Sequence, residues 1–196
     1  MIPDGYTQLT PGKIAAVVTY LEMRARPPLA DAGHGGVQLR RVPNPALDWY
    51  LERYRRAGAN WLWFSRLEMT EEQLLAVLRR STTELFVTER DGSEIGLAEL
   101  DRSQAEDVEI ASFALFPEAI GKGLGRPFMV QVLERAWQAS TKRVWLHTCT
   151  LDGPAALSFY IKCGFRPYRR AIEVADDPRL RGILPEDAAP QVPIIR

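Results

Sequence analysis

The order of strand and helix patterns predicts a mixed α/β fold with a mostly antiparallel central sheet. Strand patterns at 84–90 and 94–100 are joined by Asp91-Gly92, a strong hairpin signal, and residues 108–116 extend them into an antiparallel meander. A glycine-rich turn and an amphipathic helix then lead to another strand at 142–150. Because a strand, a helix and a strand in succession require a crossover connection, this last pair of strands is expected to be parallel.

The composition is that of one globular domain with extensions. The chain has 196 residues, of which 46% are hydrophobic, and this is enough to bury a substantial core. We expect an N-terminal arm at residues 1–35, a core domain at 36–174 and a proline-rich C-terminal tail at 175–196 that lies over the surface with little regular structure.

Charge and cysteine content argue against several classes of protein. The 25 basic and 25 acidic residues give a formal net charge of zero, so no overall field attracts the chain to nucleic acid or to an anionic membrane. Cys149 and Cys163 form no disulfide framework, and no cluster has the spacing of metal ligands. The N-terminus lacks a signal-peptide pattern and the longest apolar run is too short to span a bilayer, so we expect a cytoplasmic protein.

The first part of the chain contains two strand candidates separated by a linker. The stretch from Ile14 to Met23 is rich in β-branched and aromatic residues, which favours a strand, although its periodicity also fits a short buried helix. Glycines and prolines at 26–36 predict a linker. Residues 37–42 are then predicted to form the first strand of the core domain.

Two helices are predicted between this strand and the hairpin. Asn44-Pro45 supplies an N-cap followed by proline in the first turn, and Gly58 is a C-terminal stop signal. The second helix begins with a capping box at Thr70-Glu-Glu-Gln73, and Met69 and Leu74 have the spacing of a hydrophobic staple.

The aromatic segment at residues 60–67 allows two interpretations. It contains Trp61, Trp63 and Phe64, which either pack beneath the helices or contribute to a substrate pocket. Near the other end of the chain, residues 168–174 predict one more strand before the tail.

A glycine-rich turn at Gly121, Gly123 and Gly125 has the features of an anion site. It leads from a strand into a helix with Pro127 in its first turn, so several unpaired backbone N–H groups converge at a helix N-terminus. This arrangement suits phosphate, although glycines also occur where a loop packs closely under a helix. The spacing fits neither the dinucleotide fingerprint, because Arg126 stands where a glycine is required, nor a P-loop.

Two motifs occur in a characteristic order. Ile120-Gly-Lys-Gly-Leu-Gly125 follows a strand, and Tyr160 precedes Gly164-Phe165 on a later helix. In this the chain resembles the GNAT superfamily of acetyl-CoA-dependent N-acetyltransferases, over roughly residues 36 to 174, and the resemblance implies helices on both faces of the sheet. Ile120 stands where the corresponding loop of the family usually has Gln or Arg. Gly153 departs from the usual Asn, and Asp152 can cap that helix instead.

The resemblance implies transfer of an acetyl group from acetyl-CoA to a primary amine. Glu109 is the candidate base, because some members, notably histone acetyltransferases, carry a catalytic glutamate at this place, or else it binds the cationic acceptor. Tyr160 is the candidate acid for the departing thiolate. The expected cofactor-binding residues are Phe113 and Leu115 on the strand, where pantetheine pairs, and Gly121, Lys122, Gly123, Leu124, Gly125 and Arg126 on the phosphate loop.

The sequence leaves the acceptor and the partners open. A small amine, an amino acid, an antibiotic or a protein N-terminus all fit, and the aromatic segment and the N-terminal arm are expected to select among them. Two other functions also stay open: a regulatory module that binds CoA or acyl-CoA without efficient turnover, and a structural partner protein. A homodimer is also possible. A cysteine mechanism through Cys149 and His147 is disfavoured, because no third orienting group is evident.

Overall fold

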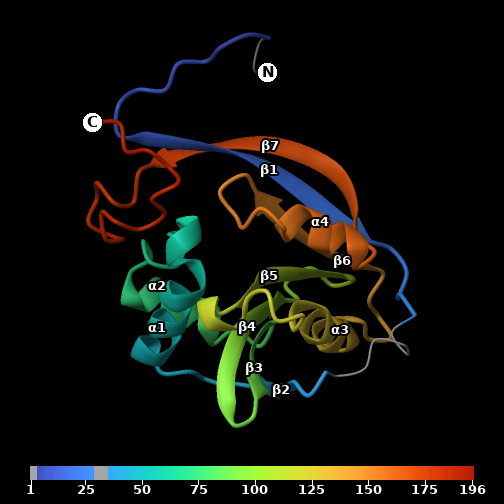
Figure 1. The fold of residues 1–196 in the computed structure, drawn as a ribbon. Helices are drawn as coiled ribbons and strands as arrows, with labels where there is room; N and C mark the ends of the chain where they lie inside the picture. Colours follow the sequence, from blue (N-terminus) through green and yellow to red (C-terminus); the bar gives the residue numbers. More distant parts are fainter. Residues whose placement is uncertain (1–3, 29–34) are drawn as a thin grey trace.

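The computed structural model describes residues 4–28 and 35–196, so most of the linker expected at 26–36 lies outside the described residues. Four α-helices and seven strands of one sheet appear in that part of the chain (Figure 1). Their bounds are β1 Lys13–Met23, β2 Gln38–Arg41, α1 Leu47–Gly58, α2 Glu71–Leu78, β3 Thr83–Arg90, β4 Ser93–Asp101, β5 Asp107–Leu115, α3 Gly125–Ala136, β6 Arg143–Cys149, α4 Ala156–Lys162 and β7 Arg166–Asp176.

The sheet has the order β2-β3-β4-β5-β6-β1-β7. Only β5 and β6 are parallel, and every other neighbouring pair is antiparallel. The predicted mixed fold with one parallel crossover is therefore confirmed. The hairpin is confirmed as well, since Asp91 (φ 52°) and Gly92 (φ 77°) both have the left-handed backbone that a two-residue turn of this kind requires.

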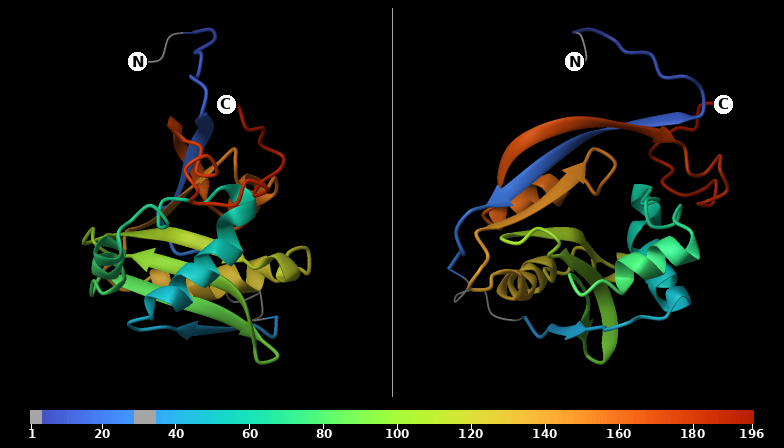
Figure 2. Two further views of the ribbon diagram at one scale, coloured as in Figure 1. Left: turned by 90° about the vertical axis from the view of Figure 1, so that its left-hand side faces the viewer. Right: turned by 180° about the vertical axis from the view of Figure 1, so that it is seen from behind.

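Helices cover both faces of the sheet, as expected (Figure 2). On one face α1 and α2 pack against Leu85, Val87 and Leu97. On the opposite face α3 and α4 pack against Phe86 and Ala98, which alternate with those residues along β3 and β4. Each face of the sheet therefore has its own hydrophobic core.

The N-terminal strand β1 lies inside the sheet. It pairs with β6 on one side and with β7 on the other, and Leu21 and Met23 are buried in the core beneath α4. The sequence predicts the strand but assigns it to an arm that precedes the core strand at 37–42. The structure instead shows residues 13–23 as part of the same sheet as β2 to β7.

The first helix ends at Gly58, as predicted, but the residues at its two ends act differently from expectation. Its N-cap residue is Ala46, which makes no side-chain cap, and Asn44 adopts a left-handed conformation (φ 50°) before the helix begins. Gly58 does not end the helix with a left-handed backbone, because the chain continues directly into a short 3-10 helix. Gly58 is required for another reason: a Cβ there would lie 2.3 Å from Cβ of Trp63. The capping box of α2 at Thr70 is confirmed.

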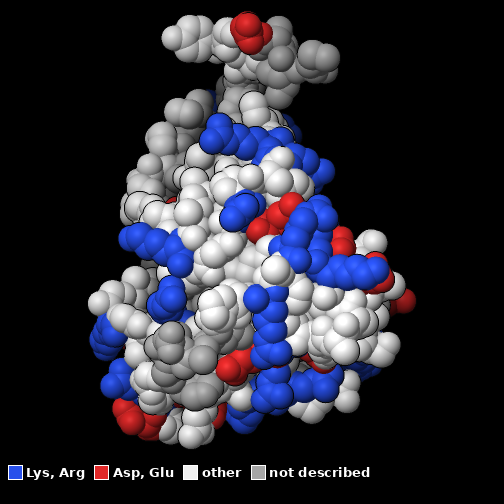
Figure 3. All heavy atoms as spheres, turned by 90° about the vertical axis from the view of Figure 1, so that its right-hand side faces the viewer, with Lys and Arg blue, Asp and Glu red and all other residues white. Residues whose placement is uncertain are grey.

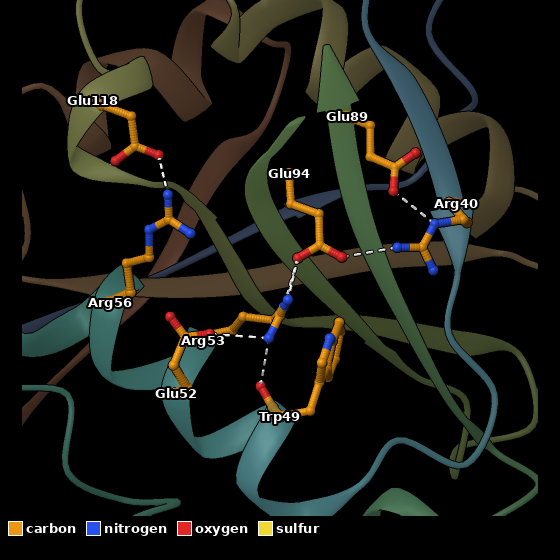
Figure 4. Close-up of polar contacts among 8 residues, drawn as sticks. All are labelled: Arg40, Trp49, Glu52, Arg53, Arg56, Glu89, Glu94 and Glu118. Atoms are coloured by element: carbon orange, nitrogen blue, oxygen red, sulfur yellow. Dashed lines mark hydrogen bonds and ion pairs between the residues drawn. The ribbon is translucent and has the colours of Figure 1, made fainter. Parts of the chain in front are cut away.

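Charged side chains on the surface join elements that are distant in the sequence. Figure 4 shows that Glu94 accepts hydrogen bonds from Arg40 of β2 and from Arg53 of α1, at 2.8 and 2.6 Å. On the face drawn in Figure 3, Lys and Arg are more prominent than Asp and Glu, although the formal net charge of the whole chain is zero. Among the described residues, no helix combines the length and apolarity needed to cross a membrane.

The C-terminal tail contains no helix or strand after β7, yet part of it is buried. Leu184, Ala188 and Ala189 form a small core with Ile14 of β1 and Leu62 of the aromatic segment. Arg179 organises this segment, since its buried guanidinium donates to both carboxylate oxygens of Asp177 and to the backbone oxygens of Ala188, Ala189 and Val192. The tail is therefore packed against the aromatic segment rather than lying loosely over the surface.

Candidate active site

The site lies where the sheet splits. β5 and β6 pair only at residues 107–109 with 143–145, and beyond that point the two strands diverge (Figure 1). A cavity of about 580 Å³ opens in the gap. It is lined from one face by Gly125 and Tyr160 and from the other by Trp63 and His147. The split thus connects the two faces of the sheet through a single cavity.

The glycine turn adjoins this cavity, which is lined by Ile120 and Gly125 at the two ends of the turn. Gly121 (φ 80°) and Gly123 (φ 74°) have left-handed backbone, and a Cβ on either would meet no atom within 4 Å. The described residues provide no acceptor for the backbone N–H groups of residues 121–126. The turn precedes α3, so these N–H groups lie at the positive end of the helix dipole. Such a cradle suits a diphosphate.

The side chains around the turn contribute anchoring and charge. Leu124 is buried against Val37 and Ile95, so it fixes the turn and leaves only its backbone for a ligand. Lys122 and Arg126 are exposed, and Arg126 donates to the backbone oxygen of Lys162 on α4. These two cations could neutralise phosphate charge in place of the side chain that Ile120 does not supply.

The edge of β5 provides a second group of predicted binding positions. Residues 110–115 pair with β4 on one side only, and the cavity lies along the other side, so the backbone there is available to an extended ligand. The ring of Phe113 stacks on Phe128, with 4.4 Å between centroids, and on Phe159. Phe113 and Leu115 both line the cavity.

Tyr160 projects from α4 into the same part of the cavity. Its ring packs edge-on against Phe113, Phe159 and Phe165, and no described residue hydrogen-bonds to its hydroxyl. Burial raises the pKa of Tyr160 well above its usual value, and the charge of Asp152 raises it further. The phenol is therefore protonated at neutral pH and can act as a hydrogen-bond donor.

Glu109 and His147 form a pair on the opposite face of the sheet. Glu109 itself does not line the cavity but lies behind His147, with 3.7 Å between its Oε1 and Nδ1 of the imidazole. The pKa of His147 is raised, first by interaction with Glu109, which outweighs the effect of burial, and further by the charges of Asp152 and Glu173. The ring of Tyr20 on β1 lies 5.6 Å from the imidazole.

The sequence alone gave His147 no role in such a pair. Strand alternation places His147 and Cys149 on one face of β6, but nothing local indicates that Glu109 of a different strand lies next to them. Burial raises the pKa of Cys149 to about 11, so its thiol is protonated at neutral pH and is unsuited as a nucleophile.

Asp152 has a different role from the helix cap that the sequence suggests. Residue Ala155 occupies the N-cap position of α4 and makes no side-chain cap. Asp152 instead accepts hydrogen bonds from Thr148 Oγ1, from the backbone N–H of Cys149 and from Nε1 of Trp63. The carboxylate thereby ties the aromatic segment to the end of β6.

Trp63 of the aromatic segment packs against the core beneath α1 and α2, as one interpretation expects, and it also lines the cavity. Leu62, in a left-handed conformation (φ 53°), is buried in the small core with the tail. Its neighbours Trp61, Trp63 and Phe64 line the cavity. Among the described residues, no three His, Cys, Asp or Glu side chains are arranged to hold a metal ion.

Solved structures with the same fold come from several bacteria. A functionally unknown conserved protein from Staphylococcus epidermidis has a TM-score of 0.57 and 14% identity, over 85% of this chain and 64% of that one. This chain thus spans less than two thirds of that protein. An IAA acetyltransferase from Bacillus cereus has a TM-score of 0.53 and 22% identity, over 68% of this chain and 79% of that one.

A third similar structure is a GNAT family acetyltransferase from Elizabethkingia anophelis with acetyl-CoA bound. It has a TM-score of 0.52 and 18% identity, over 68% of this chain and 78% of that one. At these identities the likeness shows the fold alone. No curated protein gives a significant match to the sequence.

The sequence also matches a family model, described as Acetyltransferase (GNAT) family, over residues 44–165. The match covers more than half of the chain and contains both the glycine turn and Tyr160. The chain therefore belongs to the GNAT acetyltransferase family.

Proposed function

We propose that this protein transfers the acetyl group of acetyl-CoA directly to a primary amine. The observation that carries the proposal is the single cavity that passes through the split between β5 and β6. A donor bound on the α3 and α4 face and an acceptor bound on the other face would meet there. Direct transfer needs this proximity, because the amine must approach the thioester carbonyl within contact distance.

The donor side fits acetyl-CoA by its residues. The free N–H groups of residues 121–126 would bind the diphosphate, and Lys122 and Arg126 would add charge. The open edge of β5 at Phe113 and Leu115 would pair with the amides of pantetheine. The thioester would then lie beside Tyr160, which lines the cavity.

The acceptor must lose a proton before or during attack. An alkylammonium with a pKa near ~10 is mostly protonated at neutral pH. We assign the base to His147, because its Nδ1 lies at Glu109 and its Nε2 is left for the proton of the amine. Glu109 would act through His147 as a positioning residue, rather than as the direct base that the sequence suggests. As the new C–N bond forms and the C–S bond breaks, Tyr160 would donate its proton to the thiolate.

Two measurements test the function. Titration calorimetry with acetyl-CoA should show binding, and a thiol reagent should detect free CoA once a suitable amine is added. Acetyl-CoA that binds without any thiol release across a broad amine panel would favour the regulatory module, and no binding at all would contradict both functions.

A matched pair of glycine variants assigns the binding to the turn. Gly123→Ala and Gly182→Ala both place an alanine at positive φ (74° and 69°), and neither new Cβ meets an atom within 4 Å. The backbone strain is therefore similar, about 1 kcal/mol in each. Only Gly123→Ala, in the proposed phosphate loop, should weaken the binding of acetyl-CoA. Equal binding by both variants would place the diphosphate elsewhere.

A further inference from the structure

The acceptor side of the cavity is aromatic and acidic. Its walls include Trp61, Trp63 and Phe64. Its acidic side chains are Asp152 and Glu173, and His147 of β6 also lines it. Neither Lys nor Arg is among the described residues that line it. A ligand there meets flat apolar surfaces and two carboxylates, and among the described lining residues only His147 can carry a positive charge.

Glu173 is the carboxylate that remains free for a ligand. Both oxygens of Asp152 already accept hydrogen bonds, from Trp63 on one side and from β6 on the other. Glu173 pairs with Ala16 across β7 and β1, shares a face with His147, and contributes to raising the pKa of that imidazole. No described residue forms a hydrogen bond or an ion pair with its carboxylate.

The aromatic walls are held in place rather than mobile. The indole of Trp63 donates to Asp152, and its backbone N–H donates to the carbonyl of Gly58. The indole of Trp61 packs against Gly153, where a Cβ would come within 3.4 Å of the ring. Leu62 between them is anchored in the core with the tail. Fixed rings of this kind bind an aromatic ligand at a low cost in conformational entropy.

We propose that the acceptor is an aromatic primary amine without a carboxylate next to its nitrogen, such as an arylalkylamine. The ring would pack on Trp61 and Trp63, while Glu173 would attract the ammonium. An amino acid of the same shape would bring its carboxylate against Asp152 and Glu173, and no Lys or Arg of the described residues lines the cavity to pair with it, which disfavours it. This inference rests on the proposed acetyl transfer and names the substrate class of the same site.

The test compares amines that differ in one group. Tyramine against tyrosine, and tryptamine against tryptophan, isolate the carboxylate, while putrescine is a cationic amine without a ring. We expect kcat/KM for each aromatic amine to exceed that of its amino acid and that of putrescine by roughly 100-fold, as expected of a site that leaves one charge unpaired.

Glu173→Gln tests the ammonium site, with Glu134→Gln as the control, because Glu134 is an exposed glutamate of α3 that does not line the cavity. Glu173→Gln should raise KM for tyramine roughly fivefold, the scale of one solvent-exposed ion pair, and leave KM for acetyl-CoA unchanged. Glu134→Gln should change neither value.

The outcomes separate this inference from the proposed function. Efficient transfer to amino acids or to putrescine, with none to the aromatic amines, would overturn the substrate class while the transferase stands. Equal KM values for tyramine in the two glutamate variants would overturn the role of Glu173. If the protein binds no acetyl-CoA, the proposed function fails and the inference fails with it.

Discussion

Replacement of Arg179 by methionine tests how far the tail supports the site. The side chains of Arg179 and Asp177 are 1% and 2% exposed, and the guanidinium also serves three backbone carbonyl groups. Removing one partner of a buried ion pair leaves an uncompensated charge and typically costs about 3–5 kcal/mol. Because the tail is peripheral, it can detach locally while the rest of the domain stays folded. The free energy of this local detachment sets an upper limit to the loss of stability.

The assay combines urea denaturation with limited trypsin digestion, which would cut after Arg181 once the tail detaches. We expect the free energy of unfolding of Arg179→Met to fall by about 3–5 kcal/mol, or trypsin to cut the variant rapidly. Acceptor turnover should also fall, because Leu62 loses its packing against the tail. Asp177→Asn combined with Arg179→Met should be more stable than Arg179→Met alone, since no buried charge remains. Arg196→Met, which breaks an exposed pair with Glu186, is the control and should change stability by less than about 1 kcal/mol. An Arg179→Met variant as stable as this control would refute the reasoning.

Three further substitutions test the site. Tyr160→Phe should lower kcat by about 10²-fold. The melting temperature should change little, because no described residue hydrogen-bonds to the hydroxyl. Unchanged turnover would exclude Tyr160 as the acid. Glu109→Gln should lower the raised pKa of His147, so the rising limb of the pH profile of kcat/KM should move to lower pH. A move of this limb to higher pH would contradict the pairing of Glu109 with His147. Gly58→Ala should displace Trp63 and raise KM for the acceptor severalfold, with the dissociation constant of acetyl-CoA as the unchanged control value.

The pH dependence of stability follows from the same His147 pair. Because the folded-state pKa of His147 is raised, its interaction with Glu109 contributes stability below the unfolded pKa of about 6.5. That contribution is lost as the pH rises through the folded-state pKa. Glu109→Gln should therefore destabilise the protein more in mildly acidic than in alkaline solution, as chemical denaturation at several pH values can show.

The parts of the fold that could be predicted from sequence depend on neighbouring residues. The capping box at Thr70 and the turn at Asp91-Gly92 are set by backbone chemistry within a few residues, and both occur as predicted. The prediction of Asn44 as an N-cap was wrong, because asparagine also suits a left-handed backbone and the structure uses it for the latter. The location of β1 depends on partners more than 120 residues away, which no local pattern identifies.

The candidate site divides in the same way. On the proposed donor side, the glycine turn is contiguous in the sequence and Tyr160 belongs to a recognisable motif, so both could be identified from the sequence. Its acceptor side is assembled from β5, β6, β7 and the aromatic segment. The pairing of Glu109 with His147 and the position of Glu173 follow from strand register, which the sequence does not state.

The position of β1 has a consequence for biosynthesis. This strand is made before the other six, but its partners β6 and β7 end only at residues 149 and 176. Until β6 has been made, Val18, Leu21 and Met23 have no strand of the sheet to join, and a long loop must close before they pair. Docking of β1 is thus a late, non-local event that leaves an apolar segment open to aggregation and to chaperone binding during translation.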